Sequence, residues 1–408
     1  MVRAWARPNE IHVRTVLTPP HPRCAQQQFR NQFPGHELKL ELSHQEEVDG
    51  MQRNNPNRRS RVKWLTCAAI PLALLLAGCS AGGGDGAEAE SKDPVSLTFA
   101  TGGGLPPNEM QAAIFSPTVI KEASLANYGK DYDLKILTTK GTSEAQTLLV
   151  SGQAQIGTVS FGTFATMQSK NAVPGGLSII AGQYLDGYKN KVSNPFMVLE
   201  SSGIKSAADL KGKTLGVNAV GSAVDVALRV WLKDQGIDPE KDVSFAEIPF
   251  GAQGAALREG KIDLGSFVQP FAAIERSTGG VKTLFTEADA LGGENAAIVI
   301  AARNDFLKSN PDAVKAFLAD WVKGLQWLSA DENREGAIKL MSEITKAPVA
   351  NLELFYGTPD DYFRDLTGCP SGAALQVGIE GMVKAGYLAK SVEVAPHVDT
   401  SYLPGSCK

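Results

Sequence analysis

The chain contains 408 residues, of which 43% are hydrophobic and 21% are charged, and its formal net charge is −4 at pH 7. A chain of this length and composition can bury a sizeable core and form one large or two medium domains. Its slightly acidic balance provides no basic field for a nucleic acid, so the composition argues against nucleic-acid binding.

Residues 1–50 are predicted to form no fold. They are polar, show no sustained hydrophobic period and carry Pro8, Pro19, Pro20 and Pro22. Met51 opens a conventional signal peptide. The preceding residues are therefore either an over-extended gene start or a genuine disordered extension, and the sequence leaves both alternatives open.

Residues 51–78 are predicted to be a lipoprotein signal peptide, and Cys79 its lipidation site. A basic stretch that includes Arg58 and Lys63 precedes a short apolar run ending in small residues. Residues 76–79, Leu-Ala-Gly-Cys, resemble the bacterial lipobox. The uninterrupted apolar run is about 15 residues long, shorter than the roughly 20 that a membrane-spanning helix needs. We therefore expect a domain held by lipid on the extracytoplasmic face of the cell membrane, with residues 79–94 as a flexible tether.

The five cysteines divide by position. Cys24 and Cys67 precede the predicted cleavage site, and Cys79 would be lipidated. Cys369 and Cys407 remain as an even pair in an oxidising location, so a disulfide between them is expected. Two free buried thiols are the alternative.

The folded part is expected to begin at Val95 and to alternate strands with helices. Strand patterns occur at 95–100, 133–138, 176–180, 196–199, 214–217, 243–247, 282–284 and 297–302. Helical periodicity recurs at 110–128, 142–150, 222–235, 251–259, 311–328 and 372–386. This alternation predicts an α/β fold with largely parallel sheets.

A weak internal repeat suggests two such units. Residues 149–157 and 257–265 share the pattern Leu-x-x-Gly, three intervening residues, then an aliphatic residue and Gly. Each matches the end of a helix, a glycine stop and a following strand. Coincidence between two helix–strand junctions is the alternative.

The sequence lacks the motifs of common catalytic sites. Downstream of Cys79 the only histidine is His397, and no Cys/His cluster, phosphate-binding loop or nucleophile elbow is present. Asp225 and Asp263 are candidate carboxylates, but neither has a paired partner visible in the sequence. No enzyme activity, metal or cofactor is therefore predicted.

The chain instead offers loops suited to binding. Ser222 is placed as the N-cap of a helix after the strand 214–217, where free amides and a hydroxyl could receive an anion or a polar group. Residues 102–104 (Gly-Gly-Gly) and 141–143 (Gly-Thr-Ser) follow two other strands. Ligands of open α/β sheets bind outside the carboxyl ends of strands. Four aromatic residues could wall such a pocket or belong to the core: Phe161, Phe164, Tyr184 and Tyr188.

From Val95 to Pro404 the chain resembles the substrate-binding lipoproteins of ABC importers, in the branch that binds nitrate, taurine, aliphatic sulfonates and thiamine-pyrimidine precursors. The resemblance is carried by residues 203–217, by 256–264, by Gln269-Pro270, and by the tail elements 386–388 and 399–403. It implies a two-lobed periplasmic-binding-protein-like fold of type II with a ligand cleft between the lobes. Lobe 1 would comprise 95–195 plus 292–408, and lobe 2 would comprise 196–291, with hinge strands near 196–199 and 297–302.

The resemblance also implies a set of ligand contacts. Those positions map onto Gly103, Gly104, Thr142, Ser143, Ser160, Phe161, Asn218, Gly221, Ser222 and Ala223, and Tyr184 and Gln269 complete the predicted set. Gln269 stands where the family often has Glu, and Lys140 is the only cation in these loops. A neutral or aromatic solute is therefore expected over a strongly anionic one. The segment 186–194 looks longer than is typical of the family.

The function implied by the resemblance is capture of a small organic or oxyanion-bearing solute by a monomer and its delivery to an ABC permease with its ATPase. Two alternatives remain. One is an enzyme like the thiamine-pyrimidine synthases that share this fold branch, and the other is a binding protein of a different transporter or of a sensor.

Overall fold

The computed structural model describes residues 3–7, 10–14, 38–40, 93–102, 110–139 and 141–407. The chain divides into two compact units, 1–85 and 86–408. The predicted signal peptide, Cys79, and the tether up to residue 92 lie outside the described residues.

The first unit contains three short strands. They are β1 (Arg3–Arg7), β2 (Glu10–Arg14) and β3 (Leu38–Leu40), in the order β1-β2-β3, with β1 antiparallel to β2 and β2 parallel to β3. These segments lie within residues 1–50, for which the sequence predicts no fold. Ile11 and Val13 alternate along β2 as a strand requires, and Pro8 falls between β1 and β2 rather than inside either.

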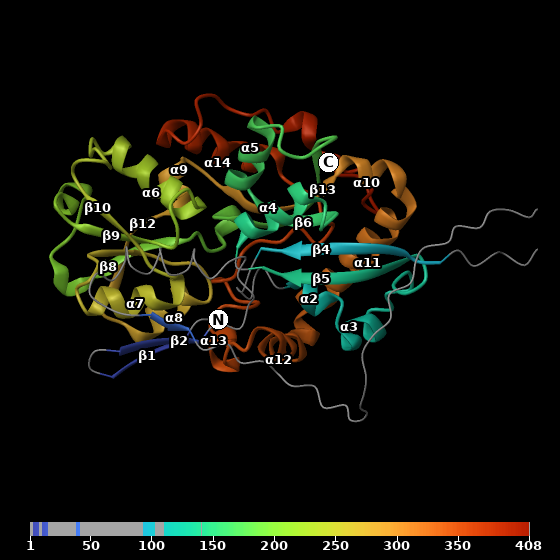
Figure 1. The fold of residues 1–408 in the computed structure, drawn as a ribbon, viewed down its shortest axis with the longest axis horizontal. Helices are drawn as coiled ribbons and strands as arrows, with labels where there is room; N and C mark the ends of the chain where they lie inside the picture. Colours follow the sequence, from blue (N-terminus) through green and yellow to red (C-terminus); the bar gives the residue numbers. More distant parts are fainter. Residues whose placement is uncertain are drawn as a thin grey trace, which may run out of the picture. The chain divides into compact units, whose positions relative to one another are not determined.

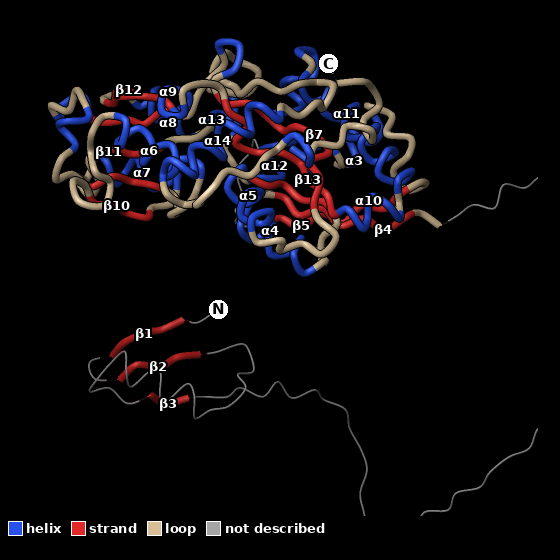
Figure 2. Tube along the Cα trace, turned by 90° about the horizontal axis from the view of Figure 1, so that it is seen from above, coloured by secondary structure: helices blue, strands red, loops and turns tan. Residues whose placement is uncertain are grey.

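The second unit is built around two five-stranded sheets (Figures 1 and 2). The first sheet has the order β5-β4-β6-β13-β7. Its strands are β4 (Val95–Thr101), β5 (Tyr132–Thr138), β6 (Ile156–Ser160), β7 (Leu177–Asp186) and β13 (Asn295–Arg303). β4 runs parallel to β5 and β6, whereas β13 runs antiparallel to β6 and β7.

The second sheet repeats this arrangement with the order β10-β9-β11-β8-β12. Its strands are β8 (Pro195–Leu199), β9 (Thr214–Val217), β10 (Ser244–Glu247), β11 (Leu264–Ser266) and β12 (Val281–Thr286). β9 is parallel to β10 and β11, and β8 is antiparallel to β11 and β12. The α/β class is confirmed, but the sheets are mixed rather than largely parallel, because β13 and β8, which follow the two crossings between sheets, run against their neighbours.

Helices cover both faces of the first sheet. Phe99 and Ile300 belong to a core with α2 (Met110–Ile114), α11 (Pro311–Ser329) and α12 (Arg334–Thr345). Ala100 and Ala301, one position along the same strands, belong to a second core with α4 (Thr142–Ser151), α5 (Phe161–Ser169) and α14 (Gly372–Ala385). Successive side chains of a strand point to opposite faces, so the two cores flank the sheet.

The remaining helices accompany the second sheet or connect elements. They are α3 (Pro117–Glu122), α6 (Ala223–Asp234), α7 (Phe250–Arg258), α8 (Phe271–Thr278), α9 (Glu287–Leu291), α10 (Asn304–Ser309) and α13 (Val349–Glu353), with short 3₁₀ turns η1 (Tyr188–Asn190), η2 (Glu200–Ser202), η3 (Ala207–Leu210), η4 (Asp331–Asn333) and η5 (Ala395–His397). The predicted repeat corresponds to the junctions α4–β6 and α7–β11, each with a left-handed glycine, Gly152 and Gly260. None of the described helices is both long and apolar enough to cross a membrane.

The C-terminal segment ties the second sheet to the first. Val226 and Val230 of α6 pack into the core that contains α14, and Lys233 Nζ donates to the carbonyl of Lys384 at 3.0 Å. Cys369 and Cys407 are joined by a disulfide, with Cα atoms 5.6 Å apart. The residue before Cys369, Gly368, accepts a hydrogen bond from Gly182 of the edge strand β7, so the disulfide holds the tail against that edge.

Candidate functional site

Polar side chains gather at the carboxyl ends of the parallel strands of the first sheet. Gly102 follows β4, and a Cβ placed on it would lie 3.0 Å from Thr158 Cγ2 and 3.1 Å from Thr142 Cγ2. Thr142 Oγ1, at the start of α4, donates to Ser160 Oγ at 3.3 Å. The ends of β4 and β6 and the start of α4 therefore meet at one place. Gly103, Gly104 and Lys140 lie outside the described residues.

The start of α5 is closed by a reciprocal capping pair and carries no acidic side chain. Ser160 caps it, since its Oγ accepts from Thr163 N at 3.1 Å while its own N donates to Thr163 Oγ1 at 2.9 Å. The first turn of α5 carries no acidic residue, whereas that of α4 carries Glu144. Thr158 Oγ1, on β6 two residues before Ser160, is buried with no hydrogen-bond partner among the described residues. Ser143 is exposed on the first turn of α4.

The loop after β9 in the second sheet reaches the same place. Asn218 follows β9, and its Oδ1 is buried without a partner in the described part of the chain. Gly221 adopts φ +77°, and its carbonyl oxygen lies 3.4 Å from where a Cβ on Gly162 of α5 would be. Ser222 caps α6 as predicted, accepting from Asp225 N at 3.3 Å, and Ala223 begins the helix. The structure thus brings residues 218–223 together with the start of α5.

A buried carboxylate occupies the start of α6. Asp225 is fully buried and accepts from Gly221 N at 2.8 Å, from Arg229 Nε at 2.9 Å and from the Tyr387 hydroxyl. Burial and this carboxylate raise the pKa of Tyr387. The amide of Val220 is likewise taken by Glu247 Oε1 at 2.7 Å. The expected free amides around Ser222 are therefore partly used by the chain's own carboxylates, which disfavours an anionic ligand group at this helix end.

Three residues predicted as ligand contacts have other partners in the structure. The Phe161 ring is fully buried in the core, where a Cβ on Gly378 of α14 would lie 2.4 Å from it. Tyr184 is 8% exposed and stacks on Tyr362 with ring centroids 4.3 Å apart. Gln269 is 1% exposed, with Nε2 donating to Asp360 O at 2.7 Å and Oε1 accepting from Ala273 N at 3.1 Å. These side chains hold the fold together, and none presents a free surface to a solute here.

The sequence identifies Asp225 as a candidate carboxylate but does not reveal its hydrogen-bond partners, Gly221, Arg229 and Tyr387. Tyr387 lies 162 residues away in the chain, so nothing local signals the contact. The spacing Ser222-x-x-Asp225 is a weak sequence signal for one of these contacts. It is typical of a helix start at which the acidic side chain of the third helical residue accepts a hydrogen bond from a main-chain amide near the cap. Among the described residues, no group of three or more His, Cys, Asp or Glu side chains is placed to hold a metal ion.

Comparison with known proteins identifies a family. The model of the NMT1-like family matches residues 116–342, more than half of the chain. The nitrate/nitrite binding protein NrtA of Nostoc sp. is 27% identical over 146 residues, which are 36% of this chain and 33% of that protein. A relative from Brucella abortus is 28% identical over 165 residues, 40% of this chain and 50% of that one. The chain thus spans a third to a half of the length of these curated relatives.

Solved structures share the fold. The periplasmic aliphatic sulphonate binding protein SsuA from Escherichia coli aligns with a TM-score of 0.57 at 16% identity, covering 75% of this chain and 92% of that one. The nitrate-binding protein NrtA from Synechocystis PCC 6803 gives 0.56 at 17% identity, covering 76% and 87%. The desulfurization enzyme DSZB gives 0.52 at 16% identity, covering 76% and 97%. The predicted fold is confirmed, and it is one that both binding proteins and an enzyme adopt.

Proposed function

The chain belongs to the NMT1-like family, and we propose that it is the solute-binding component of an ABC importer. The matched relative from Nostoc is named for nitrate and nitrite binding, and a structural neighbour for aliphatic sulphonate binding. In this proposal the solute binds between a lobe formed by 95–195 plus 292–408 and a lobe formed by 196–291. The first range contains the first five-stranded sheet, and the second contains the other sheet except for Pro195, the first residue of β8.

The observation that carries the proposal is a pair of unsatisfied polar atoms at one end of the two sheets. Thr158 Oγ1 and Asn218 Oδ1 are buried without partners in the described residues. Thr158 lies in β6 and Asn218 in the loop after β9, and these two segments are linked through Thr142, Ser160 and the Gly162–Gly221 contact. A buried polar atom without a hydrogen bond is costly, and a solute that bonds to both would relieve that cost. These atoms therefore mark the floor of the proposed cleft.

The charges at the starts of α5 and α6 favour a solute with one acidic end and one uncharged polar end. The start of α5 has no acidic residue in its first turn and can receive an oxyanion through its free amides. The start of α6 already holds the carboxylate of Asp225, so the solute should present a neutral polar group to Asn218. We propose a small organic acid such as a sulfonate or carboxylate, with its acidic oxygens at α5 and an uncharged polar portion at the 218–223 loop.

The proposal is tested by binding measurements on the purified protein. Thermal shift and calorimetry against sulfonates, nitrate, aromatic acids and pyrimidines should identify at least one solute class. Thr158→Val preserves side-chain shape, and Asn218→Ala removes the amide. Each is expected to raise the solute Kd about 5- to 150-fold, because one hydrogen bond in a buried site contributes about 1–3 kcal/mol.

Thr98→Val is the matched control, because Thr98 lies three residues before the end of β4 and should leave the affinity unchanged. Equal affinity in Thr158→Val and the unsubstituted protein would place the solute elsewhere. The enzyme alternative predicts release of a product from the bound acid, detected by chromatography. The described histidine of the second unit, His397, packs edge-on against Phe164 of α5 with ring centroids 5.8 Å apart.

Anchoring through Cys79 is a separate part of the proposal. The disulfide between Cys369 and Cys407 supports an oxidising location outside the cytoplasm. A lipid on Cys79 would hold the receptor beside its permease. When expressed in a bacterial host, the unsubstituted protein should fractionate with membranes and incorporate labelled fatty acid. Cys79→Ser should do neither, and labelling that survives this substitution would exclude Cys79 as the lipidated residue.

A further inference from the structure

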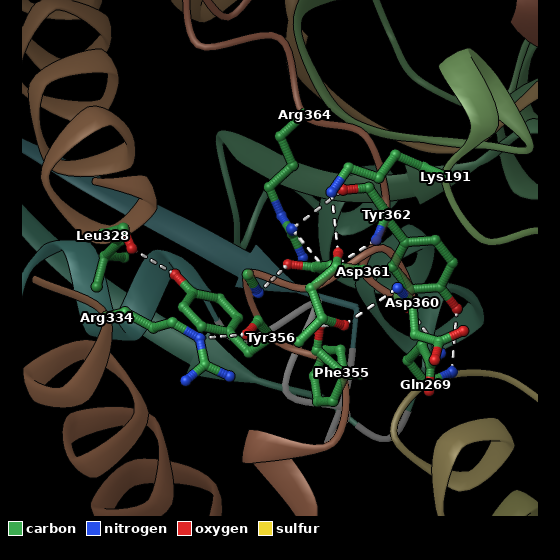
Figure 3. A network of polar contacts seen from close by, with 12 residues as sticks. Lys191, Gln269, Leu328, Arg334, Phe355, Tyr356, Asp360, Asp361, Tyr362 and Arg364 are labelled. Atoms are coloured by element: carbon green, nitrogen blue, oxygen red, sulfur yellow. Dashed lines mark hydrogen bonds and ion pairs between the residues drawn. The ribbon is translucent and has the colours of Figure 1, made fainter. Parts of the chain in front are cut away.

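A cavity of about 270 Å³ lies outside the residues that form the proposed cleft. Its walls come from the end of α11, from η4 and the first residue of α12, from residues 356–366, and from Lys191 in the connection between β7 and β8. Figure 3 shows this region, with Arg334, Arg364 and Lys191 arranged around Tyr356 and Asp361. None of the residues predicted to contact the solute lines this cavity.

The cavity wall carries an excess of positive charge. Three cationic side chains, Lys191, Arg334 and Arg364, line it together with two acidic ones, Asp331 and Asp361. Lys191 Nζ donates to the carbonyl of Thr358 at 2.9 Å, and Arg334 Nε donates to that of Tyr356 at 2.8 Å. Both acceptors are neutral main-chain carbonyls, which orient the two cations without cancelling their charge.

Both carboxylate oxygens of Asp361 accept hydrogen bonds from residues of its own loop. Its Oδ1 accepts from Arg364 Nη1 at 2.9 Å and from Tyr362 N at 2.8 Å, and its Oδ2 accepts from Gly357 N at 3.0 Å. The Arg364 and Asp361 side chains are 6% and 7% exposed. This pair fixes the Arg364 guanidinium in place through Nη1, and the Nε–Nη2 edge takes no part in it.

The Nε–Nη2 edge of Arg364 carries hydrogen-bond donors that no described residue accepts from. Nε and Nη2 of Arg364 are both buried and have no hydrogen-bond partner in the described residues. The N–H groups on these two nitrogens point side by side, in the geometry that matches two oxygens of one carboxylate, sulfate or phosphate group. Burying charged donors without partners is costly, so a ligand that satisfies both gains that energy.

We propose that this cavity is a second anion-binding site, for a small oxyanion that presents two oxygens to the Nε–Nη2 edge of Arg364. Lys191 and Arg334 flank the bound anion and complete its neutralisation. The ligand class is a free carboxylate, sulfate or phosphate, or a small molecule that carries one of these groups. The cavity volume accommodates an anion of that size with some accompanying water.

The site lies next to segments that connect the two sheets. Tyr362, in the cavity wall, accepts from Gln269 N at 3.1 Å and donates to Asn194 Oδ1 at 2.6 Å. Asp360 pairs with Arg276 of α8. An anion on Arg364 therefore orders the same loop that contacts the second sheet.

The test is calorimetric titration of the purified full-length chain with sodium sulfate, sodium phosphate and sodium acetate at constant ionic strength set by sodium chloride. At least one of the three should bind saturably with one site per chain. Arg364→Lys keeps the charge but removes the fork, and should raise the Kd at least tenfold. Arg334→Gln, at the half-buried start of α12, should also weaken binding and covers the case in which the Arg364 variant fails to fold.

Lys339→Gln is the matched control, because Lys339 is exposed on the same helix as Arg334 and does not line the cavity. It should bind as the unsubstituted protein does. Asn218→Ala separates this site from the proposed cleft, since it should leave anion binding intact. The proposal is overturned if no oxyanion saturates, or if binding survives both arginine substitutions. It is equally overturned if Asn218→Ala abolishes binding while Arg364→Lys does not.

Discussion

Replacing Cys369 and Cys407 together with serine is expected to lower the free energy of unfolding by about 4 kcal/mol. The disulfide closes a loop with a sequence separation of 38 residues, and cross-linking a loop of that length removes roughly this much chain entropy from the unfolded state. Urea unfolding of the double variant and of the unsubstituted protein measures the difference.

The contacts of the tail explain why the folded state should survive this loss. Leu403 packs against Gly368, where a Cβ would lie 3.1 Å from Leu403 Cδ2, and Tyr402 packs against the core beneath α11. Both contacts persist without the sulfur bridge. Reductant should therefore bring the unsubstituted protein to the stability of the double variant and leave that variant unchanged. Equal stability of the two proteins under oxidising conditions would show that the bridge contributes little.

The elements with strong local periodicity could be predicted closely from the sequence. The strand expected at 214–217 is β9 at Thr214–Val217, and the helix expected at 311–328 is α11 at Pro311–Ser329. In both, side-chain alternation or spacing coincides with burial, so the local pattern reports the tertiary environment. Helix α5 was missed because it is buried on several sides and shows no amphipathic pattern, although Ser160 and Thr163 form a capping pair that marks its start.

The candidate site could be predicted only as far as main-chain geometry sets it. Thr142, Ser160 and Ser222 lie at helix starts as expected, because strand–loop–helix order fixes that position. The side-chain contacts of Phe161 and Gln269 could not be predicted in the same way. Phe161 packs against Gly378 and Gln269 bonds to Asp360, and both partners are distant in the sequence. The unpaired donors of Arg364 are likewise invisible until the fold brings the end of α11 and the 356–366 loop together.

Two fully buried carboxyl groups lie where the chain passes between the sheets. Asp186 ends β7, and Glu287 begins α9 just after β12. Asp186 accepts from Ser193 Oγ at 2.5 Å and from Asn194 N at 2.8 Å, while Glu287 Oε2 accepts from Asn194 Nδ2 at 2.8 Å. Asn194 therefore bridges the two carboxyl groups and couples their titration.

Burial raises the pKa of both groups well above the usual carboxyl range, and the charge of Asp186 raises that of Glu287 further. Hydrogen bonds from Ser193 and Asn194 oppose the shift of Asp186. The neighbouring ring hydroxyls of Tyr184 and Tyr362 are themselves raised in pKa by burial and by these carboxyl groups, so they remain neutral. Around neutral pH the pair is expected to retain a proton.

The consequence is a stability that falls as pH rises. In the unfolded chain these carboxyl groups ionise near pH 4, whereas the folded protein holds at least one proton to neutral pH or above. Between those limits the folded state binds more protons than the unfolded state, so the free energy of unfolding decreases with increasing pH. This contribution is fully present below about pH 4 and is lost as the pH passes through the raised folded-state pKa values.

Glu287→Gln is expected to remove most of that decline. Glutamine is the neutral isostere of the protonated acid. Its Oε1 can accept from Asn194, and its amide can donate to Asn295 Oδ1, which is buried without a partner in the described residues. The variant should match the unsubstituted protein at pH 4 and exceed its free energy of unfolding at pH 8 by at least about 1.4 kcal/mol, the value of one pKa unit. Urea unfolding across this pH range measures the difference.

Glu380→Gln, on the exposed side of α14, is the control and should leave the dependence of the free energy of unfolding on pH unchanged. If Glu287→Gln lowered stability equally at both pH values, the carboxyl pair would be ionised in the folded protein, because a group that stays protonated is replaced by an amide without loss.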